Sequence, residues 1–148
     1  MTKGSTTKGS TSPPANISEF NTITGLVFTK LYGQFPLAVD LDRAAIASEM
    51  GTAISSGSLQ SGRPFTEVFA HSLTWLSDEG YVRSAGPLPH EKVTLTQKGL
   101  AALNAVPQGL SATIGSSLAT SASAGNLSSV GDLVGGIIGG ITKSMASG

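Results

Sequence analysis

The stretch from Pro64 to Pro107 most constrains the fold, because it combines helical segments with a hairpin between them. Apolar residues recur every three or four positions from Phe65 to Leu76, which is the spacing of one helical face. Gly80 follows at the place where helices commonly end in a left-handed residue. Two short apolar runs, Tyr81–Arg83 and Val93–Leu95, flank a turn rich in Gly and Pro and predict antiparallel strands. The chain must therefore fit a small sheet among helices.

Further elements are predicted on both sides of this stretch. Ser18 can cap a first helix, and alternating residues from Leu37 to Leu41 predict a short half-buried strand. Asp42 can cap a helix from Arg43 to Met50, and Thr96 can cap a last helix after the hairpin. The apolar face of the first helix comprises Phe20, Ile23, Val27 and Leu31. The predicted fold class is α+β and mostly α, with a small antiparallel sheet and a C-terminal helical segment.

Composition divides the chain into three parts. Residues 1–16 are polar and predict a flexible N-terminal arm, residues 17–106 form the folded body, and residues 107–148 are rich in Gly, Ser and Ala. The last part is expected to be helical or partly disordered. A chain of 148 residues has room for one hydrophobic core with extensions. The N-terminal residues lack the apolar segment of a secretory signal, so the cytoplasm is the expected location.

Two short sequences in the body resemble a known family. The sequence from Trp75 to Val82 is WLSDEGYV, and the sequence from Val93 to Leu100 is VTLTQKGL. Both are similar to the winged-helix superfamily, and most to its multiple-antibiotic-resistance and phenolic-acid-decarboxylase regulator types. The resemblance implies the order helix, strand, helix, helix, hairpin, helix over residues 20–106. For members that bind DNA, it implies a third helix in the major groove and a hairpin, or wing, on the backbone.

The charge distribution argues against strong binding to nucleic acid. Between Ile17 and Val106 there are six Lys and Arg against eight Asp and Glu, a net charge of −2. The exposed side of the predicted third helix has no Lys or Arg, the residues that neutralise phosphates and bind base edges. The loop from Thr52 to Gly62 is longer than the turn of a tight helix-turn-helix. If DNA is bound, the expected contacts are Arg63, His71, Arg83 and Lys92.

The residue types needed for catalysis or metal binding are sparse. The absence of Cys excludes a disulfide, a thiolate metal site and a Cys nucleophile. His71 and His90 are too few for a metal site, and His71 and Ser72 are adjacent in a predicted helix, where side chains point in different directions. The Asp78–Glu79 doublet belongs to the winged-helix resemblance. We therefore expect no catalytic, cofactor-binding or metal-binding residues, and a protein that is not an enzyme.

The C-terminal segment carries apolar residues at helical spacing. The expected partner-binding residues are Leu127, Val130, Leu133, Val134, Ile137, Ile138 and Ile141. Gly131, Gly135 and Gly139 recur every four residues and would give a helix a smooth strip for close packing. Docking on the body, self-association and contact with a bilayer are the alternatives. A membrane span is not expected, because the apolar stretch is shorter than about 20 residues and contains Asp132.

These observations lead to a hypothesis of function. We expect a non-catalytic protein-interaction and assembly module on a winged-helix scaffold, in which the C-terminal helix mediates self-association or docks a partner protein. A homo-oligomer is the expected assembly. The alternative is a DNA-binding transcription regulator of the winged-helix type. A third option is a protein that contacts a membrane surface through its tail.

Overall fold

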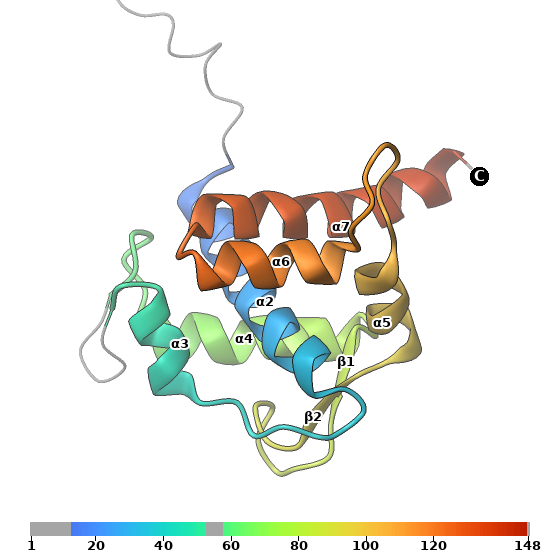
Figure 1. The fold of residues 1–148 in the computed structure, drawn as a ribbon. Coiled ribbons are helices and arrows are strands. Elements are labelled where there is room, and N and C mark those ends of the chain that lie inside the picture. The colour runs from blue at the N-terminus through green and yellow to red at the C-terminus, as the bar shows by residue number, and fades with distance from the viewer. Residues whose placement is uncertain (1–12, 53–57, 148) are drawn as a thin grey trace, which may run out of the picture.

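A computed structural model describes residues 13–52 and 58–147, with side chains described as far as Gly139. Within these residues the chain forms six helices and one two-stranded sheet (Figure 1). The elements are α2 (Ala15–Gln34), α3 (Arg43–Glu49), α4 (Phe65–Asp78), β1 (Val82–Ser84), β2 (Val93–Leu95), α5 (Gln97–Asn104), α6 (Ile114–Ser123) and α7 (Leu127–Ser147). The predicted fold class, α+β and mostly α with a small antiparallel sheet, is confirmed.

Helix α2 begins at Ala15, so the prediction that Ser18 caps it is wrong. Pro14 precedes the helix in an extended conformation, and the Ser18 N–H donates to the Pro14 carbonyl at 3.0 Å. The fixed φ of a proline suits the start of a helix, whereas a residue before a proline avoids the helical conformation. The pair Pro13–Pro14 therefore sets the start of α2. As a consequence Ala15 and Asn16, assigned above to the arm, belong to the helix.

Other predicted helix ends are confirmed at the level of atoms. The Asp42 carboxylate accepts from the Ala45 N–H at 3.1 Å, and the Thr96 hydroxyl oxygen accepts from the Gly99 N–H at 3.1 Å. Gly80, after α4, has a φ of 84°, the left-handed conformation that glycine adopts without strain. Local capping chemistry therefore fixes these three boundaries.

The predicted strand from Leu37 to Leu41 is reduced to a single bridge. Only Val39 pairs, antiparallel to Val93 of β2, through backbone hydrogen bonds of 2.9 and 2.8 Å. The Leu37 N–H instead closes a turn by donating to the Gln34 carbonyl at 2.8 Å, and the Leu37 side chain is 65% exposed. The turn takes the start of the segment away from the sheet. The main sheet is the hairpin, in which Val82 of β1 faces Leu95 of β2.

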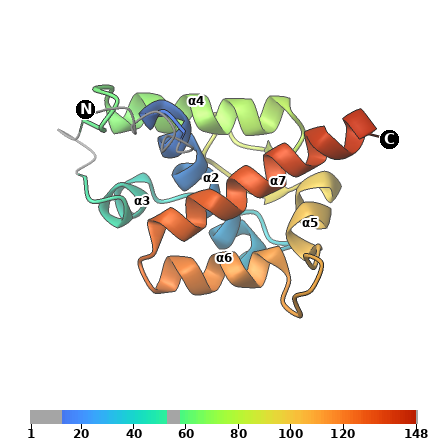
Figure 2. The same cartoon turned by 90° about the horizontal axis from the view of Figure 1, so that it is seen from above.

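Helix α2 is the centre of the molecule. It contacts α4 on one side and α6 and α7 on another, with α7 crossing over it (Figure 2). The buried apolar residues of α2 are Ile23, Leu26, Val27, Phe28 and Leu31. They form one cluster with residues of α4, of the hairpin and of the C-terminal helices. A helix with apolar residues on several sides needs cover on each of them.

Gly25 allows the C-terminal helices to approach the backbone of α2. A Cβ at this position would overlap Val130 Cγ1 and would lie 3.1 Å from Val134 Cγ2 and 3.5 Å from Leu118 Cδ2. All three of these side chains are fully buried. The absence of a side chain at Gly25 is therefore a condition for the observed crossing of α2 by α6 and α7.

Candidate functional site

The apolar face of α7 is largely occupied within the chain. Of the residues expected to bind a partner, Val130, Val134 and Ile137 are buried in the core cluster. For these three the expectation of partner contact is corrected, because α2 needs cover on this side and α7 supplies it. The half-buried members of the set are Leu127, Leu133 and Ile138. Ile141 lies beyond the residues whose side chains are described.

The glycine strip of α7 follows α2 for part of its length. A Cβ at Gly131 would lie 3.8 Å from Thr22 Oγ1, and a Cβ at Gly135 would lie 3.8 Å from Asn21 Nδ2. At Gly139 the surrounding space is open. An alanine would therefore fit at ordinary contact distance at the first two positions, so the packing of α7 on α2 does not depend on the expected smooth strip. None of the helices in the described residues is long and apolar enough to cross a bilayer.

The four candidate nucleic-acid contacts lie in two places. Arg63, just before α4, forms an ion pair with Glu67 at 3.5 Å, and His71 is exposed on the same helix. Arg83 lies on β1 and Lys92 in the hairpin turn, both exposed. The structure therefore brings Arg63 and His71 to one surface and leaves the other two on the hairpin. His71 is exposed and the adjacent Ser72 is buried, as expected of neighbours in a helix.

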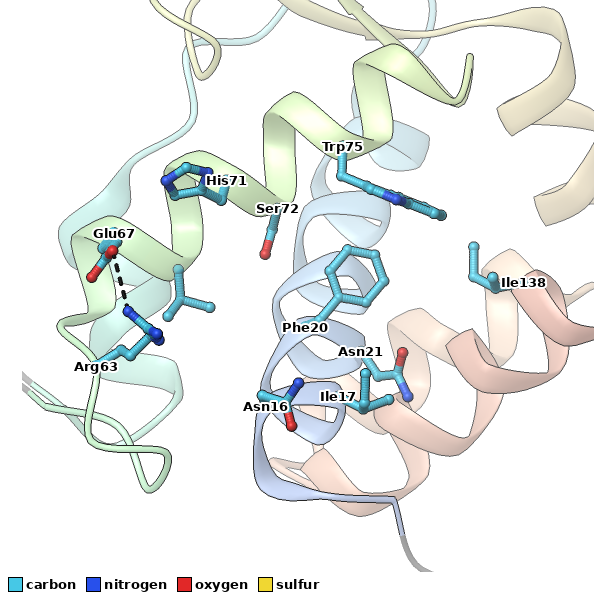
Figure 3. Close-up of a pocket in the computed structure, with 11 residues that line it drawn as sticks. Asn16, Ile17, Phe20, Asn21, Arg63, Glu67, His71, Ser72, Trp75 and Ile138 are labelled. Carbon is cyan, nitrogen blue, oxygen red and sulfur yellow. Dashed lines mark ion pairs between the residues drawn. The ribbon is translucent and has the colours of Figure 1, made fainter.

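A groove lies between α2, α4 and α7 in the described part of the chain. It encloses about 640 Å³. Its apolar lining consists of Ile17, Phe20, Val68, Trp75 and Ile138. Figure 3 shows that Phe20 lies in the middle, with Trp75 above it and Ile138 on the opposite wall. The sequence alone does not reveal this groove, because its walls come from three helices that are separated along the chain.

Aromatic rings make one wall of the groove rigid. The ring of Trp75 meets the ring of Phe20 edge to face, with centroids 5.2 Å apart and planes at 82°. On its other side Trp75 stacks with Tyr81 at 6.3 Å. Trp75 nevertheless remains 39% exposed, and Ile17 across the groove is 44% exposed. Large apolar side chains are thus held open to solvent around a hollow, a feature typical of binding surfaces.

Polar side chains also line the groove, namely Asn16, Asn21, Arg63, Glu67, His71 and Ser72. The ion pair of Arg63 with Glu67 compensates the two charged lining residues. Ser72 is only 4% exposed, and in Figure 3 its hydroxyl points from α4 toward the side of Phe20. Neither the Ser72 hydroxyl nor the Asn21 carboxamide makes a hydrogen bond to the part of the chain that the structure describes. The groove therefore offers an apolar surface with unpaired hydrogen-bonding groups.

Acid-base and metal chemistry have little support in the described residues. No three His, Asp or Glu side chains gather there in a way that could hold a metal ion. Burial, and to a smaller extent Glu79, raise the pKa of Tyr81. The Tyr81 ring carries the Lys98 ammonium 4.4 Å from its centroid, so this tyrosine has a packing role.

Comparisons with protein-family models, with curated proteins and with solved structures find no match.

Proposed function

We propose that the chain is a non-catalytic protein-interaction module on a winged-helix scaffold, and that it docks a partner in the groove of α2, α4 and α7. One observation carries the proposal. From Phe65 to Asp78, helix α4 has no Lys or Arg, and its exposed side forms a wall of an apolar groove. In DNA-binding members of the winged-helix superfamily, the corresponding helix would need Lys or Arg side chains to contact DNA.

The order of elements supports the scaffold part of the proposal. A helix, a bridged segment at Val39, two helices, a hairpin and a further helix follow each other along the chain. The winged-helix resemblance implies this order. Winged-helix domains also serve as protein-docking platforms, so the scaffold is compatible with the proposed activity.

The composition of the groove supports a protein partner. Binding energy at protein interfaces concentrates in a few buried aromatic and apolar anchors, and amphipathic helices commonly pack into grooves between helices. Trp75, Phe20 and Ile17 provide such anchors on α4 and α2. Ile138 of α7 adds the third wall, so the C-terminal segment contributes by completing the groove. Assembly of identical chains and docking of another protein both fit this surface.

Capture of partners from extracts of the native cell tests the proposal. Tagged wild-type chain is compared with Ile17→Asp, in which a charge enters the groove at an exposed position, and with Leu37→Asp. Leu37 is more exposed than Ile17 and lies outside the groove, so its substitution is the matched control. We expect the same partner with the wild type and with Leu37→Asp, and at least tenfold less with Ile17→Asp. Equal capture by all three chains would contradict the proposal.

A cytoplasmic location is part of the same proposal. The partner is then a cytoplasmic protein, and fractionation of the native cell checks this point. Recovery of the chain with the membrane or outside the cell would contradict it.

DNA binding through the hairpin is a second candidate function. Arg83 and Lys92 are both exposed there, which favours contact with phosphates. A gel shift at low salt decides between the two functions, because phosphate contacts are strongest under that condition. If a complex forms through the hairpin, Arg83→Ala should weaken it, whereas Arg63→Ala, on the surface beside α4, should have little effect. Absence of a complex would contradict this second candidate function.

A further inference from the structure

Ser72 is a polar residue whose surroundings differ from those of a packed serine. The residue as a whole is only 4% exposed, and no hydrogen bond joins its hydroxyl to another described residue. It lines the groove, and its hydroxyl points into it (Figure 3). Among the described residues, Thr24 Oγ1 is the side-chain atom that is both fully buried and without a partner, so the Ser72 oxygen keeps access to the groove. A polar group at the wall of an apolar hollow can orient a bound molecule by a hydrogen bond.

The rest of the groove restricts the chemistry of this ligand. A volume of about 640 Å³ falls within the range of small-molecule sites. Phe20, Trp75 and Ile138 present apolar surface, and the paired charges of Arg63 and Glu67 leave no net charge to attract an ion. Asn21 adds a second unpaired polar group on the side of α2. The site is therefore suited to an uncharged molecule with an apolar body.

We propose that the groove binds a small uncharged amphiphile, such as an alicyclic or aliphatic alcohol or amide. Its apolar body packs against Trp75 and Phe20, and its polar group hydrogen-bonds to the Ser72 hydroxyl, with the Asn21 carboxamide within the same groove. Binding of this ligand needs no protein partner. If the groove also docks a protein as proposed above, the two compete for one surface.

The N-terminal arm is a poorer occupant of the groove. Residues 1–12 are almost entirely Ser, Thr, Gly and Lys, with Met1 as the one large apolar residue. This composition offers little apolar surface to pack against Phe20 and Trp75, so the segment suits the groove poorly.

The intrinsic fluorescence of Trp75 provides a direct assay, because it is the only Trp in the chain and lies in the groove. Purified full chain is titrated with borneol, a rigid alicyclic alcohol, and with bornane, the same hydrocarbon cage without the hydroxyl. We expect a saturable shift of Trp75 emission to shorter wavelength with borneol and weaker binding of bornane. Ser72→Ala should weaken borneol binding by about two- to tenfold, the range for one neutral hydrogen bond. Ser77→Ala, an exposed serine of the same helix outside the groove, should have no effect.

Three results would overturn the proposal. One is the absence of a saturable response to borneol, and another is equal affinity of wild type and Ser72→Ala while circular dichroism shows both folded. The third is an emission shift that follows protein dilution and not borneol, which would assign the groove to a second copy of the chain. Because the titration contains no partner protein, a failure here leaves the protein-docking proposal to its own test.

Discussion

At the scale of residues, the motif behind the winged-helix resemblance has a structural role. The Thr96 hydroxyl donates to the backbone carbonyls of Gly80 and Tyr81, and the Lys98 ammonium donates to the Glu79 carbonyl at 2.8 Å. These contacts tie the end of α4 to the start of α5. These residues therefore stabilise the fold, and they carry little information about what is bound.

Gly99 belongs to the same connection and gives a stability prediction. A Cβ at this position would overlap the Tyr81 carbonyl oxygen, so Gly99→Ala should lower the free energy of unfolding by about 1–3 kcal/mol. Gly33→Ala is the control, because Gly33 lies in α2 with open space around it and should gain up to about 1 kcal/mol. Urea denaturation measures both values. A neutral effect of Gly99→Ala would contradict the close approach.

Substitution of Thr24 is predicted to raise the free energy of unfolding. Its hydroxyl is buried and has no hydrogen-bond partner in the described chain. Thr24→Val removes this unpaired group at similar volume and should raise the free energy of unfolding by about 1 kcal/mol. Thr29→Val is the control, since the Thr29 hydroxyl donates to the Gly25 carbonyl at 2.9 Å and its loss should bring no gain. A loss of stability in Thr24→Val would mean that the hydroxyl has a partner.

The raised pKa of Tyr81 predicts that the folded chain loses stability at alkaline pH. Burial, followed by Glu79, raises its pKa, so the folded chain favours the neutral phenol. The unfolded chain loses the proton first, from about pH 10, and the contribution of Tyr81 to stability is lost as the pH rises through its folded pKa. Between about pH 9 and 11, the free energy of unfolding should fall less for Tyr81→Phe than for the wild type. Equal pH profiles of unfolding would contradict this.

At the scale of elements, local signals predicted more than tertiary packing did. Caps and stops at Asp42, Thr96 and Gly80 lie where the sequence placed them, because each depends on neighbouring residues alone. The prediction of a strand from Leu37 to Leu41 holds only as a bridge at Val39, because the Leu37 N–H closes a turn with the Gln34 carbonyl. The fate of α7 was left open. An amphipathic helix has the same sequence pattern whether it packs on its own chain or on another one.

The crossing of α2 and α7 at Gly25 is testable by substitution. The Cβ that Gly25→Val adds would overlap Val130 Cγ1 and lie 3.1 Å from Val134 Cγ2, so α7 should move away from α2. We expect unfolding to require at least about 2 kcal/mol less free energy, with faster amide hydrogen exchange in α7. Gly33→Val, with open space around it, controls for helix propensity. Unchanged exchange in α7 would contradict the observed crossing.

At the scale of the whole molecule, the body and the C-terminal helices share one core. The buried side chains that α6 and α7 contribute are Leu118, Val130, Val134 and Ile137. Each contributes about 1.5–3 kcal/mol on burial, so together they contribute roughly 6–12 kcal/mol, which is similar to the total stability of a domain of about 5–15 kcal/mol. A chain that ends at Pro107 should therefore fail to unfold cooperatively on heating. A sharp calorimetric transition of the shortened chain would show that the body folds alone.

The groove exists only in the assembled molecule, which explains why its residues could not be predicted. Phe20 was assigned to a core face, and Ser72 was considered only together with His71. Each was judged from its own helix, whereas the site depends on α2, α4 and α7 together. The exposed Trp75 lies beside an apolar hollow only because α7 forms one wall of that hollow.

Photocrosslinking in the native cell tests the central claim most directly. A photoreactive amino acid replaces Ile17 at the edge of the groove, and in a second chain it replaces the exposed Leu37 away from it. If the groove docks a protein, irradiation should yield a discrete protein adduct, either a second copy or another chain, from position 17 and not from position 37. No adduct from position 17, or the same adducts from both positions, would contradict the claim.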